Sequence, residues 1–162
     1  MTTQSAFTSA EWKTLMQAPF VAGLYITMAD PSLSGSFKES VAVASKVVNT
    51  ARSTSGTELL MALAGEFNNF SHAAQARPEF AAHNIESIKA EALADINAAA
   101  ELLQQKATAA ESAEIRHWLY SVAVAAAEAA KEGGFLGIGG ARVSDAEKAV
   151  LAQLAQALNI SA

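Results

Sequence analysis

Five carboxylates near two loops are the residues whose types and spacing could bind a metal ion. Asp30 and Glu39 flank the first loop, Glu132 precedes the second, and Asp145 and Glu147 open the helix that follows it. Carboxylate oxygens that converge from loops and helix ends suit hard cations such as Mg²⁺ or Ca²⁺. We therefore predict one or two solvent-accessible sites for a divalent cation, built from these five acids.

The same acids also fit two other interpretations. Ser144 and Glu147 form the S-x-x-E pattern of a capping box, in which the two side chains satisfy free N–H groups at a helix start. The helix dipole favours negative charge at that end, so capping alone can explain Asp145, Glu147 and Glu39. General acid–base catalysis by a carboxylate pair would need a cleft and a shifted pKa, which the sequence does not show.

The second loop belongs to the stretch KEGGFLGIGGARVSDAEK, residues 131–148, which holds five of the nine glycines. It has neither the spacing of a P-loop nor that of a dinucleotide-binding fingerprint. It is not an EF-hand, because Phe135, Leu136 and Ile138 occupy the interior of the loop. Since glycine adopts positive φ without penalty, the pattern favours a tight helix connector anchored by apolar residues. The alternative is a loop that positions its two flanking acids for a cation.

Motifs typical of enzymes do not occur in this chain. His72, His83 and His117 stand in neither H-x-x-x-H nor H-E-x-x-H spacing, and no G-x-S-x-G is present. The absence of cysteine excludes disulfides, thiolate metal sites and a cysteine nucleophile. We therefore expect a protein that is not an enzyme.

Composition and charge indicate the class of protein. With 162 residues and a net charge of −5, the chain suits one globular domain and lacks the basic footprint of a nucleic-acid or anionic-membrane binder. The longest nearly apolar run, residues 18–29, is shorter than the roughly 20 residues that span a bilayer. The start MTTQSAFTSAEWK has no basic region before an apolar stretch, so we expect no signal peptide.

Apolar residues recur at helical spacing along the chain, and no stretch shows the alternation of a strand. The sequence thus predicts an all-α fold, a compact bundle of about seven helices in a single domain over residues 1–162. The expected helices cover residues 8–17, 19–29, 37–52, 58–70, 78–103, 111–131 and 144–158.

Prolines and phenylalanines refine this prediction. Pro19 suits the first turn of a helix, where its missing N–H costs nothing, so we predict a helix break after Gln17. Pro78 is expected to open the long fifth helix in the same way. In the polar stretch 67–80, which is typical of a loop or a helix end, we expect three phenylalanines to anchor the chain on the core, or alternatively to contact a partner; they are Phe67, Phe70 and Phe80.

Two helix-loop-helix segments echo each other at the two ends of the chain. They read YITMADPSLSGSFKESVAVASKVVN and VAAAEAAKEGGFLGIGGARVSDAEKAVLAQLAQALNIS. In this organisation the chain resembles the TerB-like tellurite-resistance family, an all-α fold whose segments have the form A-D-G-x-x-x-x-x-E. The stretch VSDAEKAVLAQLAQALNIS is similar to the family's last helix, and the stretch from Asp30 to Glu39 to its first motif, with Asp-Pro in place of Asp-Gly.

The resemblance implies a small stress-response protein, without known catalytic activity, that binds divalent cations through acidic residues. On this basis we expect a cytoplasmic protein with Mg²⁺, Ca²⁺ or Zn²⁺ as its cofactor. Its expected partners are other tellurite-resistance components or a second copy of the chain in a homodimer. We expect it to bind neither nucleic acid nor a membrane. The alternative is a helical protein-interaction module without metal, in which the acids only cap helices and solvate their faces.

Overall fold

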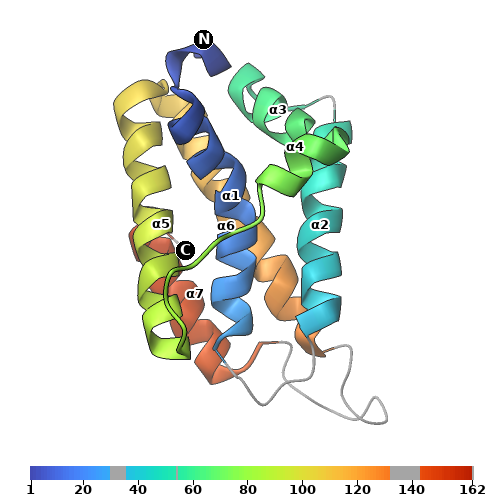
Figure 1. Ribbon diagram of the computed structural model, residues 1–162, viewed down its shortest axis with the longest axis vertical. Helices are drawn as coiled ribbons and strands as arrows, with labels where there is room; N and C mark the ends of the chain where they lie inside the picture. Colours follow the sequence, from blue (N-terminus) through green and yellow to red (C-terminus); the bar gives the residue numbers. More distant parts are fainter. Residues whose placement is uncertain (30–35, 54, 132–142, 162) are drawn as a thin grey trace.

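The computed structural model describes residues 1–29, 36–53, 55–131 and 143–161, which form α-helices and two short 3₁₀ helices (Figure 1). The α-helices are α1 (Ser9–Thr27), α2 (Ser36–Arg52), α3 (Glu58–Gly65), α4 (Phe70–Gln75), α5 (Ile85–Lys106), α6 (Ala109–Lys131) and α7 (Asp145–Ala157). The 3₁₀ helices are η1 (Gln4–Ala6) and η2 (Glu66–Asn68). These ranges contain no strand, so the prediction of an all-α bundle is confirmed.

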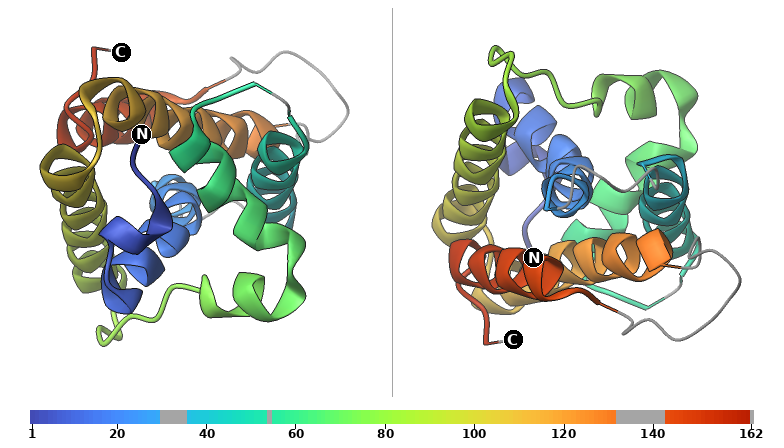
Figure 2. Two further views of the ribbon diagram at one scale, coloured as in Figure 1. Left: turned by 90° about the horizontal axis from the view of Figure 1, so that it is seen from above. Right: turned by 90° about the horizontal axis from the view of Figure 1, so that it is seen from below.

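α1 is the central helix of the bundle and packs against α2, α5, α6 and α7. Seen end-on, it is surrounded by the other helices (Figure 2). Its second half is the longest apolar run of the chain, and a helix that is apolar on all sides belongs in the core. Leu15, Ala22 and Ile26 are accordingly at most 2% exposed.

The predicted break at Pro19 is wrong, because α1 continues through this residue as one helix. Proline inside a helix removes one N–H and crowds the carbonyl four residues earlier, at a cost of about 3 kcal/mol or more. Here tertiary burial offsets that cost, since Pro19 is buried and its neighbours Ala18 and Val21 are only 2% and 1% exposed. Local propensity is overridden by the position of this helix in the core.

The predicted start of the long fifth helix at Pro78 is also wrong. Pro78 lies in the non-helical segment 77–84, which leads from α4 to α5 along the outside of the bundle (Figure 1). α5 begins at Ile85 because Asn84 caps it, its Oδ1 accepting a hydrogen bond of 2.9 Å from the backbone N–H of Ser87. A side-chain cap, and not the proline, therefore sets this helix start.

The helix predicted over residues 58–70 is divided into α3, η2 and α4. Asn69 caps α4 by accepting a hydrogen bond of 2.9 Å from the backbone N–H of Ser71. This cap starts a new helix in a different direction, which the apolar spacing did not reveal.

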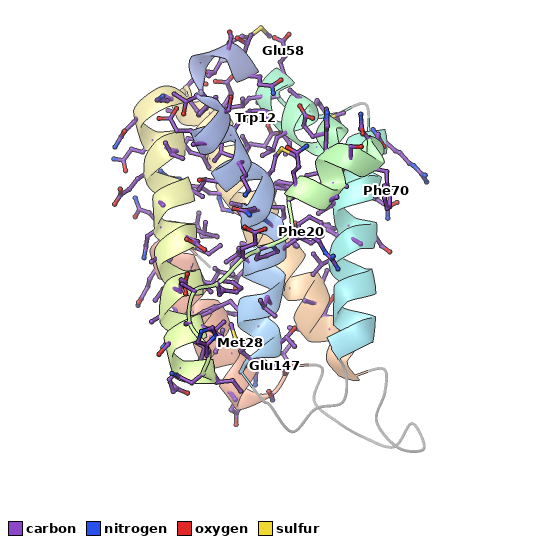
Figure 3. The ribbon with its side chains drawn as sticks, viewed as in Figure 1. Trp12, Phe20, Met28, Glu58, Phe70 and Glu147 are labelled. Atoms are coloured by element: carbon purple, nitrogen blue, oxygen red, sulfur yellow. The ribbon has the colours of Figure 1, made fainter. Side chains whose placement is uncertain are left out.

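The three phenylalanines of this region have different environments. Phe67 is 8% exposed and packs edge-on against Phe20, with ring centroids 5.5 Å apart. Phe80 is partly buried against the core. Phe70, in contrast, is 90% exposed and lies on the outer side of the bundle (Figure 3). The predicted anchoring on the core is confirmed for Phe67 and Phe80 and wrong for Phe70.

Candidate functional site

The structure describes the side chains of two of the five predicted cation ligands. Asp30 and Glu132 lie outside the described residues, and Glu39 lies in α2 with its side chain outside the described part. Asp145 and Glu147 lie in the first turn of α7. The Asp145 side chain is 99% exposed, and its Oδ1 accepts a hydrogen bond of 3.1 Å from Nζ of Lys148. Glu147 is only 2% exposed, so the two acids have different surroundings.

Glu147 completes a capping box at the start of α7. Its Oε2 accepts hydrogen bonds from the backbone N–H and the hydroxyl of Ser144, both at 2.6 Å, and Ser144 Oγ accepts one of 3.2 Å from the backbone N–H of Glu147. Figure 3 shows Glu147 at the lower end of the bundle, near Met28, the residue that follows the end of α1. The capping interpretation of this acid is confirmed. Among the described residues no group of three or more His, Asp or Glu side chains could hold a metal ion, and the cation site stays a prediction.

Glu111 forms a second capping box, at the start of α6. Its Oε2 accepts hydrogen bonds from the backbone N–H of Thr108 at 2.9 Å and from the hydroxyl at 2.7 Å, and its Oε1 accepts one of 2.8 Å from the backbone N–H of Thr2. Burial acts to raise the pKa of Glu111, but these hydrogen bonds outweigh it and hold the pKa at about 2, below the ordinary value of 4.5. The T-x-x-E pattern signals the box in the sequence, whereas the contact with Thr2 arises only in the fold.

A groove of about 740 Å³ lies between α5 and α7, with Tyr25 of α1 beneath it. The Tyr25 hydroxyl donates a hydrogen bond of 2.7 Å to Oε1 of Gln153 and so joins α1 to α7. Burial raises the pKa of Tyr25, which keeps the phenol protonated as a donor. Leu93 of α5 and Val150 of α7 line the groove and are only half-buried, so apolar surface stays accessible between the two helices.

Charged residues lie at the end of this groove where α5 begins. Glu86 is 85% exposed and forms an ion pair with Lys89, in which Nζ lies 3.6 Å from Oε1. The sequence motifs predict no site here, although the groove residues of α5 recur at the three- and four-residue spacing of one helix face; they include Glu86, Lys89, Leu93 and Asn97. What the sequence does not reveal is that the facing helix leaves this side of α5 partly uncovered.

The histidines do not form a shared site in the part of the chain that the structure describes. His72 forms a close hydrogen-bonded contact with Glu66 of η2, beside a hollow of about 350 Å³ that reaches Trp12. His117 is exposed, while its neighbour Trp118 is buried.

No family model, curated protein or solved structure matches the chain. The resemblance to the TerB-like family, and the stress-response role that it implies, therefore stay predictions. Across the described ranges, no helix has both the length and the apolar character needed to cross a bilayer.

Proposed function

We propose that the protein is a helical interaction module that acts by binding and not by catalysis, and that the groove between α5 and α7 receives an amphipathic helix of a partner protein. The groove itself carries the proposal. Half-buried Leu93 and Val150 offer apolar surface from two neighbouring helices, and Gln153 and Gln156 add amide groups along the α7 side. An amphipathic helix binds such a groove by laying its apolar face into it.

The charge of the protein indicates the charge of the partner. With 16 acidic against 11 basic side chains, the chain carries a net charge of −5, which attracts positively charged partners and speeds their association. Glu86, the ion-pair partner of Lys89, has a carboxylate that is 85% exposed at the end of the groove. The partner helix is therefore basic, with Lys or Arg flanking an apolar stripe at helical spacing.

Selection from a peptide library tests this proposal with a defined probe. A library of basic amphipathic helices with randomised apolar positions is selected against the full-length protein, with sequence-scrambled peptides as the reference. Ala90 and Ala94 are both exposed on α5, and only Ala90 lines the groove. We expect Ala90→Arg to lower the affinity for the selected peptides on the order of tenfold or more, because the new side chain overlaps with the bound helix and repels its positive charge. Ala94→Arg should leave the affinity unchanged.

Two results would contradict the interaction module. One is a selection in which helical peptides are not enriched over scrambled ones. The other is a set of peptides that bind Ala90→Arg as tightly as the unmodified protein.

A further inference from the structure

Arg116 of α6 is a buried arginine that uses little of its hydrogen-bonding capacity. It is 8% exposed, and its Nη2 donates a hydrogen bond of 2.8 Å to the carbonyl of Ala100 in α5. Its Nε has no partner among the described residues, and none of their carboxylates forms an ion pair with it. A guanidinium carries five N–H donors and a permanent charge, and in Arg116 the described residues leave that charge without a counter-ion.

Arg116 lines a hollow of about 480 Å³ beside the turn between α5 and α6. Ala109, Ser112, Ala113 and Arg116 form one wall, because spacings of three, four and seven residues place them on one face of α6. The two alanines are small, which leaves room in front of the guanidinium. No Asp or Glu is among the described residues that line the hollow, although acids outnumber bases in the chain.

The opposite wall is built by the chain after α7. Asn159 has a φ of 51° and ends the helix in the left-handed region. Its N–H donates to the carbonyl of Gln156, and the N–H of Ile160 donates to the carbonyl of Ala155, both at 3.0 Å. These two bonds are a Schellman closure, which fixes the direction of the chain after the helix. Asn159 and Ser161 therefore line the hollow on a defined backbone.

We propose that this hollow binds the carboxylate group of a small organic acid, with the Arg116 guanidinium as its principal partner. A buried charge without a counter-ion is unfavourable, and a bound anion would remove that cost. The planar fork of a guanidinium matches the two oxygens of a carboxylate. His117 also lines the hollow, but no Lys or second Arg is among the described lining residues, so Arg116 is the only permanent positive charge there. A single permanent charge suits a monovalent carboxylate better than a phosphate dianion.

The rest of the lining selects polar acids. Gln104, Ser112 and Asn159 offer amide and hydroxyl groups to a hydroxyl or amide of the ligand. The volume lies within the range of about 300 to 1,000 Å³ that is usual for small-molecule sites. The carboxylate has two sources, a free small acid or the terminal carboxylate of a polypeptide. This site is separate from the α5–α7 groove, and the proposal does not depend on the interaction module.

The first experiment uses the unmodified protein. Sodium lactate and N-acetylalanine are titrated while the side-chain N–H resonance of Arg116 and the melting temperature are followed. Lactamide and N-acetylalanine amide are the uncharged controls, and sodium chloride is the control for ionic strength. We expect the two carboxylates to shift the Arg116 resonance saturably and to raise the melting temperature, and the three controls to do neither. Equal responses to the amides or to chloride would overturn the proposal.

Variants of Arg116 distinguish the contribution of its guanidinium to binding from that of the surrounding residues. Arg116→Met replaces the buried charge with an apolar chain and should fold without loss of melting temperature, but should not respond to the acids. Arg116→Lys keeps the charge without the fork, and we expect on the order of 10- to 100-fold weaker binding. Arg77→Met, at an exposed arginine, is the matched control and should bind as the unmodified protein does. Undiminished binding of the acids by Arg116→Lys and Arg116→Met would refute the assignment. If Arg116→Met does not fold, Arg116→Lys and the resonance titration of the unmodified protein test the assignment instead.

The source of the carboxylate is resolved in the same titration. An acetylated tetrapeptide that ends in alanine is compared with N-acetylalanine and with the amidated tetrapeptide. Binding of the small acid alone assigns the hollow to free acids, and binding of both acids extends it to polypeptide termini. If neither acid binds, the proposal fails.

Discussion

Gly23 of α1 and Val43 of α2 pack so closely that a methyl group on Gly23 would overlap with Cγ2 of Val43. Glycine inside a helix costs about 1 kcal/mol relative to alanine. Here the missing side chain allows α2 to approach the central helix, and Val43 is only 4% exposed at the contact. The close packing of these two helices explains a glycine in the most apolar helix of the bundle.

Gly23→Ala is expected to destabilise the protein by about 1 to 3 kcal/mol, because the added methyl group overpacks the contact. Gly65 at the end of α3 is the matched control, since an added Cβ there meets no atom within 4 Å. Gly65→Ala should stabilise by roughly 0.5 to 1 kcal/mol. Urea unfolding measures both changes. In the double variant with Val43→Ala, the loss should be smaller than the sum of the single losses; strict additivity would contradict the contact.

Glu111 makes the stability of the protein depend on acid pH. Because its pKa is about 2 in the folded chain and ordinarily 4.5, its contribution to stability is complete above about pH 4.5 and is lost as the pH falls toward 2. Glu111→Gln should therefore flatten the fall of the unfolding free energy over this window. Glu86→Gln, at a side chain that is 85% exposed, is the control and should not flatten it. Identical pH profiles for Glu111→Gln and the unmodified protein would refute this role.

Phe67 and Phe70 should differ strongly in their effect on stability. Phe67→Ala removes a buried ring that packs on Phe20, and we expect a loss of about 3 to 5 kcal/mol. Phe70→Ala removes an exposed ring and should change stability by less than about 0.5 kcal/mol. Thermal unfolding of the two variants compares them directly, and equal losses would contradict the exposure of Phe70.

The capping box of α7 can be tested at its serine. Ser144→Ala removes the hydroxyl that accepts from the N–H of Glu147 and donates to its carboxylate. We expect a loss of about 0.5 to 2 kcal/mol, the usual contribution of an N-cap. Ser144→Thr keeps a capping hydroxyl and should retain most of the stability. A loss in Ser144→Thr as large as that in Ser144→Ala would show that the hydroxyl is not the cause.

Divalent cations test the predicted acidic site. At about 100 times the dissociation constant, a bound cation should raise the melting temperature by roughly 5 to 11 °C. The exposed Asp145 allows a clean variant, and Asp145→Asn should reduce this rise while changing the cation-free protein little. Sodium chloride at equal ionic strength controls for screening. The site is excluded if the melting temperature stays unchanged with all four cations, Mg²⁺, Ca²⁺, Mn²⁺ and Zn²⁺.

The sequence by itself determined the features that depend on neighbouring residues. The apolar spacing predicted the helix class throughout, and it located α2 to within a residue, as residues 37–52 against Ser36–Arg52. The capping box of Ser144 and Glu147 fixed the start of α7, because both of its partners lie within one helical turn. These signals are local, so they can be recognised without knowledge of the fold.

The tertiary structure alone decided which residues became buried, exposed or unpartnered. Pro19 stays inside α1 because surrounding helices bury it, and Phe70 remains in solvent although Phe67, three residues earlier, enters the core. In the sequence, Arg116 is one more charged residue on a helix. Only the packing of α5 and of the chain after α7 buries its side chain, and this packing places no described carboxylate beside it. Burial depends on segments far apart in the chain, and no local pattern records which of them will meet.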